Sequence, residues 1–393
     1  MKLGERYVEL ALRLQRHRDE LVFGYSGPPE LAARVAAEET FDPAKLAADA
    51  EVILAELSSS DESQGSDWLV EQTAALLTLA RSLDGHELPY REDVERSYGV
   101  EPEWYPEDEF ERTHRELDEA LGGSGDLRER YCRWLEATEL PKDILSEALS
   151  ATLAEFRERT RARFGLPEGE QVELRLVEGK RWGGYSEFVG RLGSILHVNT
   201  DLPLPSGDLA HFVAHESYPG HHTENAWKEA LLVRDQGRVE ATIVLATGPE
   251  GVIAEGLAQL ARDALLGAEA EHVTADLLAS LGFDYDPVIG ARARSARMLS
   301  NDVAANLALM HHERGAGEDE LAAYARRWTL QPEDRIEKLV AWVCTQPFRG
   351  YVVTYPAGLR LAREFVGNDP DRFKRLLTEQ LAPADLRISS AAA

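Results

Sequence analysis

The sequence predicts a mainly helical fold that contains one small β-sheet. Through most of the 393 residues, apolar side chains recur every three to four positions, which is the spacing of one face of an α-helix. Two short segments, residues 171–177 and 193–199, have instead the length and the apolar pattern of β-strands. We therefore expect a helical body with a small antiparallel β-sheet beside one of its helices.

The first part of the chain is predicted to form helices separated by polar breaks. Its apolar periodicity falls in windows without internal Pro or Gly, at residues 8–14, 46–57 and 69–80. The Ser-rich segment 58–66 is expected to be a loop, and residues 122–125, with three glycines, to be a flexible joint. We place a domain boundary there, with an N-terminal helical region at 1–122 packed on a catalytic region at 126–393.

The second part is expected to begin with a long helix over residues 141–164. Proline stands at its first turn, and Gly165 and Pro167 follow its last residue, which are start and stop signals of a helix. The two predicted strands come next. Helical periodicity then returns and continues to about residue 377.

Composition excludes several classes of function. The chain has 43 basic and 70 acidic residues and a net charge of −27, so it would repel nucleic-acid backbones and anionic lipid surfaces. Cys132 and Cys344 are too few and too far apart for a disulfide framework. The N-terminus lacks the apolar core of a secretory signal, and no apolar run approaches about 20 residues. We expect a cytoplasmic protein without nucleic-acid or membrane partners.

The segment His215-Glu216-Ser217-Tyr218-Pro219-Gly220-His221-His222 predicts a zinc site. In the usual motif two histidines lie four residues apart on one helix, and a Glu beside the first histidine acts as general base. Here the fourth residue after His215 is Pro219, which cannot bind a metal. His221 therefore becomes a ligand only if Pro219 and Gly220 open a local bulge in the helix.

Other interpretations of this segment stay open. His211 and His215 have the ideal spacing for two ligands on an unbroken helix, although Glu216 would then lose its role. His222 could replace His221 as a ligand; otherwise it is expected to orient a ligand or the substrate. The segment could also be an ordinary helix end, with its histidines near the last carbonyl groups.

Glu255 is the expected third zinc ligand. A catalytic zinc ion needs three protein ligands and one open position for water. Residues 249–266 are predicted to form a helix, on which Glu255 lies away from the apolar stripe of Ile253 and Leu257. A solvated glutamate on a surface helix is the competing interpretation.

The chain resembles a known family at these residues. The segment from His215 to His222 is similar to the His-Glu-x-x-Pro-Gly-His-His signature of the bacterial domain-of-unknown-function family eight-eight-five, which is grouped with the zincin-like metallopeptidases. The similarity covers roughly residues 140–365 and includes residues 182–185, 197–203, 255–258 and 355–358. It implies a helical zincin-like (gluzincin) fold and supports Glu255 as ligand. Leu257 departs from the family, which usually has an aromatic residue there.

A peptidase also needs groups that hold the substrate and stabilise the oxyanion. The strand at 193–199 precedes the zinc helix and could bind an extended peptide along an exposed edge, with His197 and Asn199 as contacts. His211 and His222 are further expected substrate contacts. Tyr355 is the expected oxyanion donor, and Tyr351 and Arg349 are alternatives.

Together these observations predict a zinc-dependent metallopeptidase that hydrolyses short peptides. Water on Zn²⁺, held by His215, His221 and Glu255, would be deprotonated by Glu216. Two alternatives remain: a metal-dependent hydrolase of a non-peptide amide or ester, and a non-catalytic helical protein that binds peptides.

Overall fold

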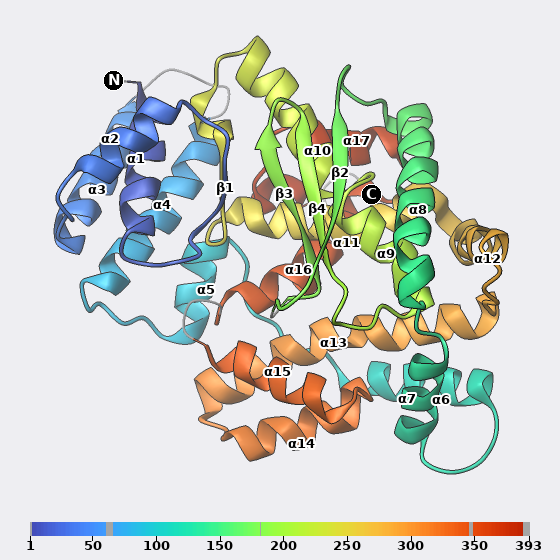
Figure 1. The fold of residues 1–393 in the computed structure, drawn as a ribbon. Coiled ribbons are helices and arrows are strands. Elements are labelled where there is room, and N and C mark those ends of the chain that lie inside the picture. The colour runs from blue at the N-terminus through green and yellow to red at the C-terminus, as the bar shows by residue number, and fades with distance from the viewer. Residues whose placement is uncertain (1, 60–65, 181, 346–348, 388–393) are drawn as a thin grey trace, which may run out of the picture.

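A computed structural model describes residues 2–59, 66–180, 182–345 and 349–387 (Figure 1). The fold is mainly helical with a small β-sheet, as the periodicity predicts. No helix in these ranges is both long and apolar enough to cross a membrane.

The N-terminal helices form a core of their own, on the left in Figure 1. They are α1 (Leu3–Gln15), α2 (Pro29–Ala37), α3 (Pro43–Ser59) and α4 (Ser66–Leu83). Strand β1 (Val22–Tyr25) leaves this unit and pairs antiparallel with β5 (Ile243–Leu245), so Ile243 and Leu245 belong to the same core. The N-terminal helices are therefore joined to the later part of the chain by backbone hydrogen bonds as well as by packing.

A larger core holds the rest of the chain together. Helices α5 (Tyr90–Tyr98) and α6 (Glu107–Leu121) contribute Tyr90 and Phe110 to it. Gly122 to Gly125 form the loop between α6 and α7 (Leu127–Ala137). Because α6 packs against α13, the larger core contains residues from both sides of this loop. The domain division at residue 122 stays a prediction.

The three-stranded sheet differs in two ways from the expected one. It consists of β2 (Gln171–Val177), β3 (Gly184–Gly190) and β4 (Gly193–Asn199) in the order β2-β4-β3. Strand β4 pairs parallel with β2 and antiparallel with β3, so the sheet is mixed rather than antiparallel. Strand β4 is also paired on both sides, and the prediction that it offers an exposed edge is wrong.

The reason lies in β3, which the sequence pattern did not reveal. Arg191 and Leu192 both have positive φ angles, at 56° and 60°, which is the backbone of a tight hairpin turn. This turn folds β3 back onto β4 and covers the side of β4 that would otherwise be an edge. Hairpin turns of this kind favour Asn and Gly, so Arg-Leu gave no turn signal.

Helices cover one face of the sheet. They are α8 (Lys142–Phe164), α9 (Ser206–Glu216), α10 (His221–Lys228), which is followed by the π-helical turn Glu229–Asp235, and α11 (Pro249–Leu266). Leu196 and Val198 of β4 enter the larger core with Val213 of α9 and Leu257 of α11. Leu257, the residue that departs from the family pattern, is therefore fully enclosed in the core.

The remaining helices surround this centre. They are α12 (Ala270–Ser280), α13 (Pro287–Arg314), α14 (Glu318–Thr329), α15 (Glu333–Cys344), α16 (Thr354–Val366), α17 (Pro370–Thr378) and α18 (Pro383–Leu386). Figure 1 shows α13 running beneath the sheet, with α14 and α15 on its far side. Short 3₁₀ turns lie at Val239–Thr242, Gly267–Glu269 and Tyr351–Val353.

Candidate metal centre

The His-Glu segment forms two helices separated by a break. Helix α9 ends at Glu216, and α10 begins at His221. Between them the amide of Gly220 donates to the carbonyl of Ala214 (2.8 Å), and a side chain on Gly220 would overlap the His215 carbonyl. The expected bulge inside one helix is corrected to a full break, because Pro219 lacks an amide hydrogen and Gly220 alone permits this close approach.

This break brings His221 back to the first histidine. The rings of His215 and His221 lie 4.8 Å apart between centroids and nearly perpendicular. The Nε2 atom of His215 lies 3.5 Å from Oε2 of Glu255, and Nε2 of His221 lies 3.8 Å from its Oε1. One ligand atom from each of the three residues lies within 4.8 Å of the others. The three predicted ligands thus meet at one point.

Glu255 reaches this point because α11 and α16 cross at two glycines. A side chain on Gly256 would overlap the backbone of Gly358, and one on Gly358 would overlap the carbonyl of Val252. The two backbones therefore touch where the helices cross. The crossing places Glu255, the residue before Gly256, beside the 3₁₀ turn that precedes α16, and there Tyr351 donates a 2.6 Å hydrogen bond to Glu255 Oε1.

The surroundings of the three residues fit a bound metal. Glu255 is 6% exposed, and its Oε2 atom has no hydrogen-bond partner among the described residues. A buried carboxylate oxygen without a partner is costly unless a cation or a donor reaches it. Two imidazole nitrogens and one carboxylate oxygen are ligands that catalytic zinc sites use. The donor set and the unpartnered oxygen therefore both match zinc.

The second nitrogen of His221 faces a buried acidic group. Its Nδ1 atom lies 3.9 Å from Oε2 of Glu224, whose Oε1 accepts a 2.8 Å hydrogen bond from Lys228. Glu224 is itself buried. A carboxylate behind a histidine fixes its ring orientation and raises its basicity.

Charges and burial move the pKa values of both histidines. Burial lowers the pKa of His221, but Glu224, Glu255 and Glu216 outweigh it and raise this pKa to about 9. Burial and the charge of His221 together hold the pKa of His215 well below its usual value. The three carboxylates thus favour a positive charge on His221 or beside it.

Glu216 lies beside the three residues and faces a cavity. Its Oε1 atom is 3.9 Å from Nε2 of His215, and its Oε2 accepts a 2.9 Å hydrogen bond from the amide of Ser186 on β3. Burial raises the pKa of Glu216 to about 7, with the charge of Glu255 adding to the effect. A carboxylate with a pKa near neutrality can both accept and return a proton.

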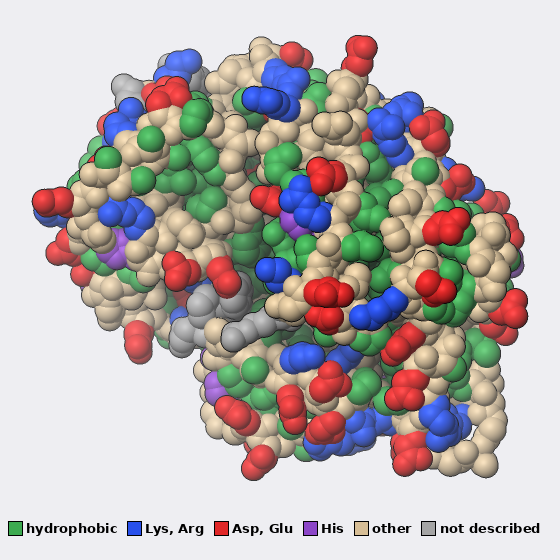
Figure 2. Space-filling view, viewed as in Figure 1, with side chains coloured by type: hydrophobic (Ala, Val, Ile, Leu, Met, Phe, Trp, Pro, Cys, Tyr) green, Lys and Arg blue, Asp and Glu red, His purple; other side chains and the backbone are tan. Residues whose placement is uncertain are grey.

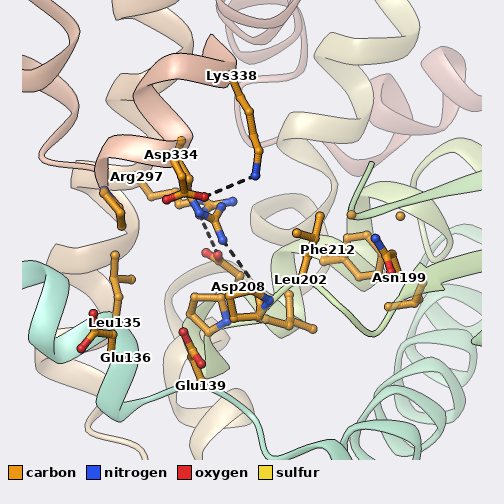
Figure 3. A pocket seen from close by; sticks show the side chains of 18 of the residues that line it. Leu135, Glu136, Glu139, Asn199, Leu202, Asp208, Phe212, Arg297, Asp334 and Lys338 are labelled. Carbon is orange, nitrogen blue, oxygen red and sulfur yellow. Dashed lines mark hydrogen bonds and ion pairs between the residues drawn. The ribbon is translucent and has the colours of Figure 1, made fainter. Parts of the chain in front are cut away.

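The cavity has a volume of about 530 Å³ and extends from Glu216 to α15 (Figure 3). It is lined by Phe212 and Asp208 of α9, by the loop after β4, and by α7, α13 and α15. Acidic and basic side chains alternate over this part of the surface (Figure 2). The charged residues Asp208, Arg297 and Arg335 could not be found from the sequence, because they stand on three separate helices without a shared motif.

His211 does not join the three candidate ligands. Its ring lies 5.7 Å from that of His215, and the ligand group found among the described residues is His215, His221 and Glu255. Burial, followed by the nearby charge of Arg294, holds the pKa of His211 well below its usual value. The charged form of this ring is therefore disfavoured.

His222 is fully buried and ties α10 to the sheet. Its Nδ1 lies 2.8 Å from Oγ of Ser194 on β4, and its Nε2 lies 3.1 Å from Oε2 of Glu170. The hydroxyl of Tyr218 donates to the same oxygen at 2.6 Å. The expected substrate contact is corrected to a structural one, since no part of His222 is accessible.

The other predicted residues are divided between the cavity and the far face of the sheet. His197 lies on the face opposite Leu196 and Val198, with its Nε2 2.8 Å from Glu187 and its ring stacked on Tyr185. It does not reach the candidate centre. Asn199 lines the cavity, while its amide donates to the carbonyls of Lys180 and Trp182.

Tyr355 lies with Tyr351 beside the candidate centre. The two hydroxyl groups form a hydrogen bond, and burial and the charges of Glu255 and Glu216 hold the pKa of Tyr355 well above its usual value. Tyr355 therefore stays a neutral hydrogen-bond donor. Arg349, an alternative, is bound to Asp93 at 2.6 Å instead.

Comparison with solved structures shows the same fold in two proteins. A candidate lipoprotein from Colwellia psychrerythraea is 18% identical with a TM-score of 0.54, over 86% of this chain and 65% of that one. A candidate lipoprotein of unknown function from Shewanella oneidensis is 12% identical with a TM-score of 0.52, over 91% and 74%. The chain thus spans about two-thirds of the first structure. No protein-family model and no curated protein sequence matches the chain.

Proposed function

We propose that this protein is a zinc-dependent metallopeptidase with a zincin-like fold. The observation that carries the proposal is the meeting of His215, His221 and Glu255, with Glu216 as a second, separate carboxylate beside a cavity. A purely structural cluster has no need for Glu216 at this position. The similarity of the His-Glu segment to family eight-eight-five supports the same conclusion.

Each residue of the site has a separate role in the proposed hydrolysis. His215, His221 and Glu255 would hold zinc, which supplies a polarised water and a positive charge for the scissile carbonyl. Glu216 would accept a proton from the attacking water and return it to the leaving amine, as its raised pKa permits. Ser186 orients Glu216 through its amide, and Tyr355 would turn its hydroxyl hydrogen from Tyr351 to the developing oxyanion.

The substrate is a short peptide bound in the cavity that begins at Glu216. A volume of about 530 Å³ lies within the range of roughly 300–1,000 Å³ of ligand sites, and it is too small for a folded chain. Binding along β4 is excluded because both of its sides are paired. The cavity, rather than strand addition at β4, is therefore the proposed route of the substrate.

Metal analysis and turnover of a mixed peptide library test the proposal together. We expect about one zinc per chain and cleavage of unfolded peptides by the wild type. Glu216→Gln should keep its zinc and lose at least about 100-fold in turnover, because the variant lacks the base. Glu187→Gln, on the far face of the sheet, is the matched control and should keep both.

Three results would contradict this proposal in different ways. Wild-type protein without tightly bound metal would favour a non-catalytic binding protein. Bound zinc without cleavage of any peptide would favour hydrolysis of a non-peptide amide or ester. Full turnover by Glu216→Gln on a confirmed substrate would place the general base elsewhere.

A further inference from the structure

The cavity beyond Glu216 has two walls of different charge. Figure 3 shows Glu136 and Glu139 on the side of α7, and Arg297 with Lys338 on the opposite side. Arg335 of α15 lines the same cavity. An anion that enters is therefore repelled by the α7 wall and attracted toward α13 and α15.

Two of the three cations already have carboxylate partners. Arg297 lies 3.0 Å from Asp208, and Lys338 lies 3.3 Å from Asp334. Arg335 is partly buried, and its guanidinium donates a 3.5 Å hydrogen bond to the carbonyl of Pro203. Within the described ranges, no carboxylate lies at ion-pair distance from Arg335.

The positive charge of Arg335 is therefore poorly balanced by the carboxylates around the cavity. Burial and the neighbouring charge of Arg297 lower the pKa of Arg335, while Asp208 and Asp334 act in the opposite direction. A guanidinium offers several donors in a fixed fork that matches a carboxylate, and a single long bond to a carbonyl uses little of that capacity. A carboxylate supplied by a ligand would satisfy the remaining donors.

We propose that Arg335 binds a carboxylate of the substrate and thereby fixes its position relative to Glu216. This proposal rests on the proposed peptidase function, because it makes the substrate a peptide that carries a carboxylate at one end of the cavity. Two sources have the same chemistry: the free C-terminus of the peptide and an acidic side chain. Recognition of a free C-terminus would make the enzyme act near the end of a peptide. Recognition of an acidic side chain would make it select peptides with an acidic residue at that position.

Peptide binding to Glu216→Gln protein tests the proposal without any need for turnover. The probes are three N-terminally labelled pentapeptides of one lysine-containing sequence: a free acid, its carboxamide, and the carboxamide with one glutamate side chain. Fluorescence anisotropy gives the affinity of each. We expect a carboxylate probe to bind about 10- to 100-fold more tightly than the plain carboxamide, which is the scale of a charge-assisted hydrogen bond.

Variants assign the effect to Arg335. Arg335→Met should abolish the preference while leaving the affinity for the plain carboxamide unchanged, and Arg335→Lys should keep part of it. Arg133→Met is the matched control, because Arg133 is an exposed arginine on α7 that does not line the cavity. Thermal unfolding of each variant establishes that it is folded.

The binding assay distinguishes the two sources of the carboxylate, and it also separates the role of Arg335 from the proposed peptidase function. Preference for the free acid supports C-terminal recognition, and preference for the glutamate probe supports an acidic side chain at the same site. Equal binding of all three probes, or a preference that Arg335→Met does not change, would overturn the role of Arg335. If the wild-type protein cleaves no peptide while the preference and its loss in Arg335→Met persist, only the proposed function is refuted.

Discussion

Replacing Gly256 by Ala should separate α11 from α16 and disturb the candidate metal centre. The added Cβ would lie 2.8 Å from Cα of Gly358 and overlap its carbonyl. Both contacts are with backbone, so no side chain can rotate away to relieve them. The helices must therefore move apart at the point where Glu255 meets Tyr351.

The expected cost follows from two opposing effects. Overpacking of a core costs about 1–3 kcal/mol and more when the backbone has to shift. Alanine regains up to about 1 kcal/mol through its higher helix propensity. We therefore expect a net loss of about 2 kcal/mol in the free energy of unfolding.

Gly251→Ala is the matched control within the same helix. Its Cβ would lie 3.8 Å from the carbonyl of Leu245, which is an ordinary contact, so this variant should gain up to about 1 kcal/mol. At about 2.1 cal/mol/K of unfolding entropy per residue, a 3 kcal/mol difference in a 393-residue chain separates the two Tm values by about 4 °C.

Calorimetry and a zinc-chelator competition measure the two consequences. Gly256→Ala should melt below Gly251→Ala and bind zinc at least about 10-fold more weakly, because Glu255 moves with the helix. Equal Tm values and equal zinc affinity in the two variants would refute the idea that the glycine crossing positions Glu255.

Three further predictions concern the surroundings of the centre. His221→Ala should lose zinc in elemental analysis while His211→Ala keeps it; the reverse result would favour the pair on the unbroken helix. Tyr351→Phe removes the 2.6 Å hydrogen bond to Glu255 and should weaken zinc binding about 10- to 100-fold in a chelator competition without unfolding the protein. Burial raises the pKa of Glu170, but hydrogen bonds from His222, Tyr218 and Arg157 outweigh it and lower this pKa to about 2. Glu170 therefore stabilises the fold above about pH 4.5, and about 2 kcal/mol, after allowance for solvent screening, should be lost as the pH falls toward 2. Denaturant titrations of Glu170→Gln should lack this pH dependence, and an identical acid transition in wild type and variant would contradict the assignment.

The sequence predicted the helical class and the candidate ligands well because both depend on local patterns. Apolar periodicity defines most helices, and residues 141–164 begin and end where Pro141 and Gly165 indicate. The grouping of the candidate ligands could be predicted from their chemical type, since two histidines and a carboxylate beside Glu216 are an unusual combination. Their roles in catalysis stay predictions.

The sheet was predicted less well because strand order depends on distant contacts. Strand β3 carries weak alternation, and its turn at Arg191 and Leu192 uses residues that seldom adopt positive φ. The partners of β4 were therefore invisible in the sequence. The same limit hid Arg335, which reaches the cavity only after α15 packs across α13.

The spacing of the two histidines shows how a break in a helix can bring two side chains together. Six positions separate His215 from His221, so on one continuous helix the second ring would point to a different side. The break at Pro219 and Gly220 cancels this difference by starting a new helix at His221. It also frees His222 to reach Ser194 and Glu170 in the core, which anchors the new helix. His221 therefore lies at the candidate centre and His222 lies in the core beneath it, because the break fixes the direction of α10.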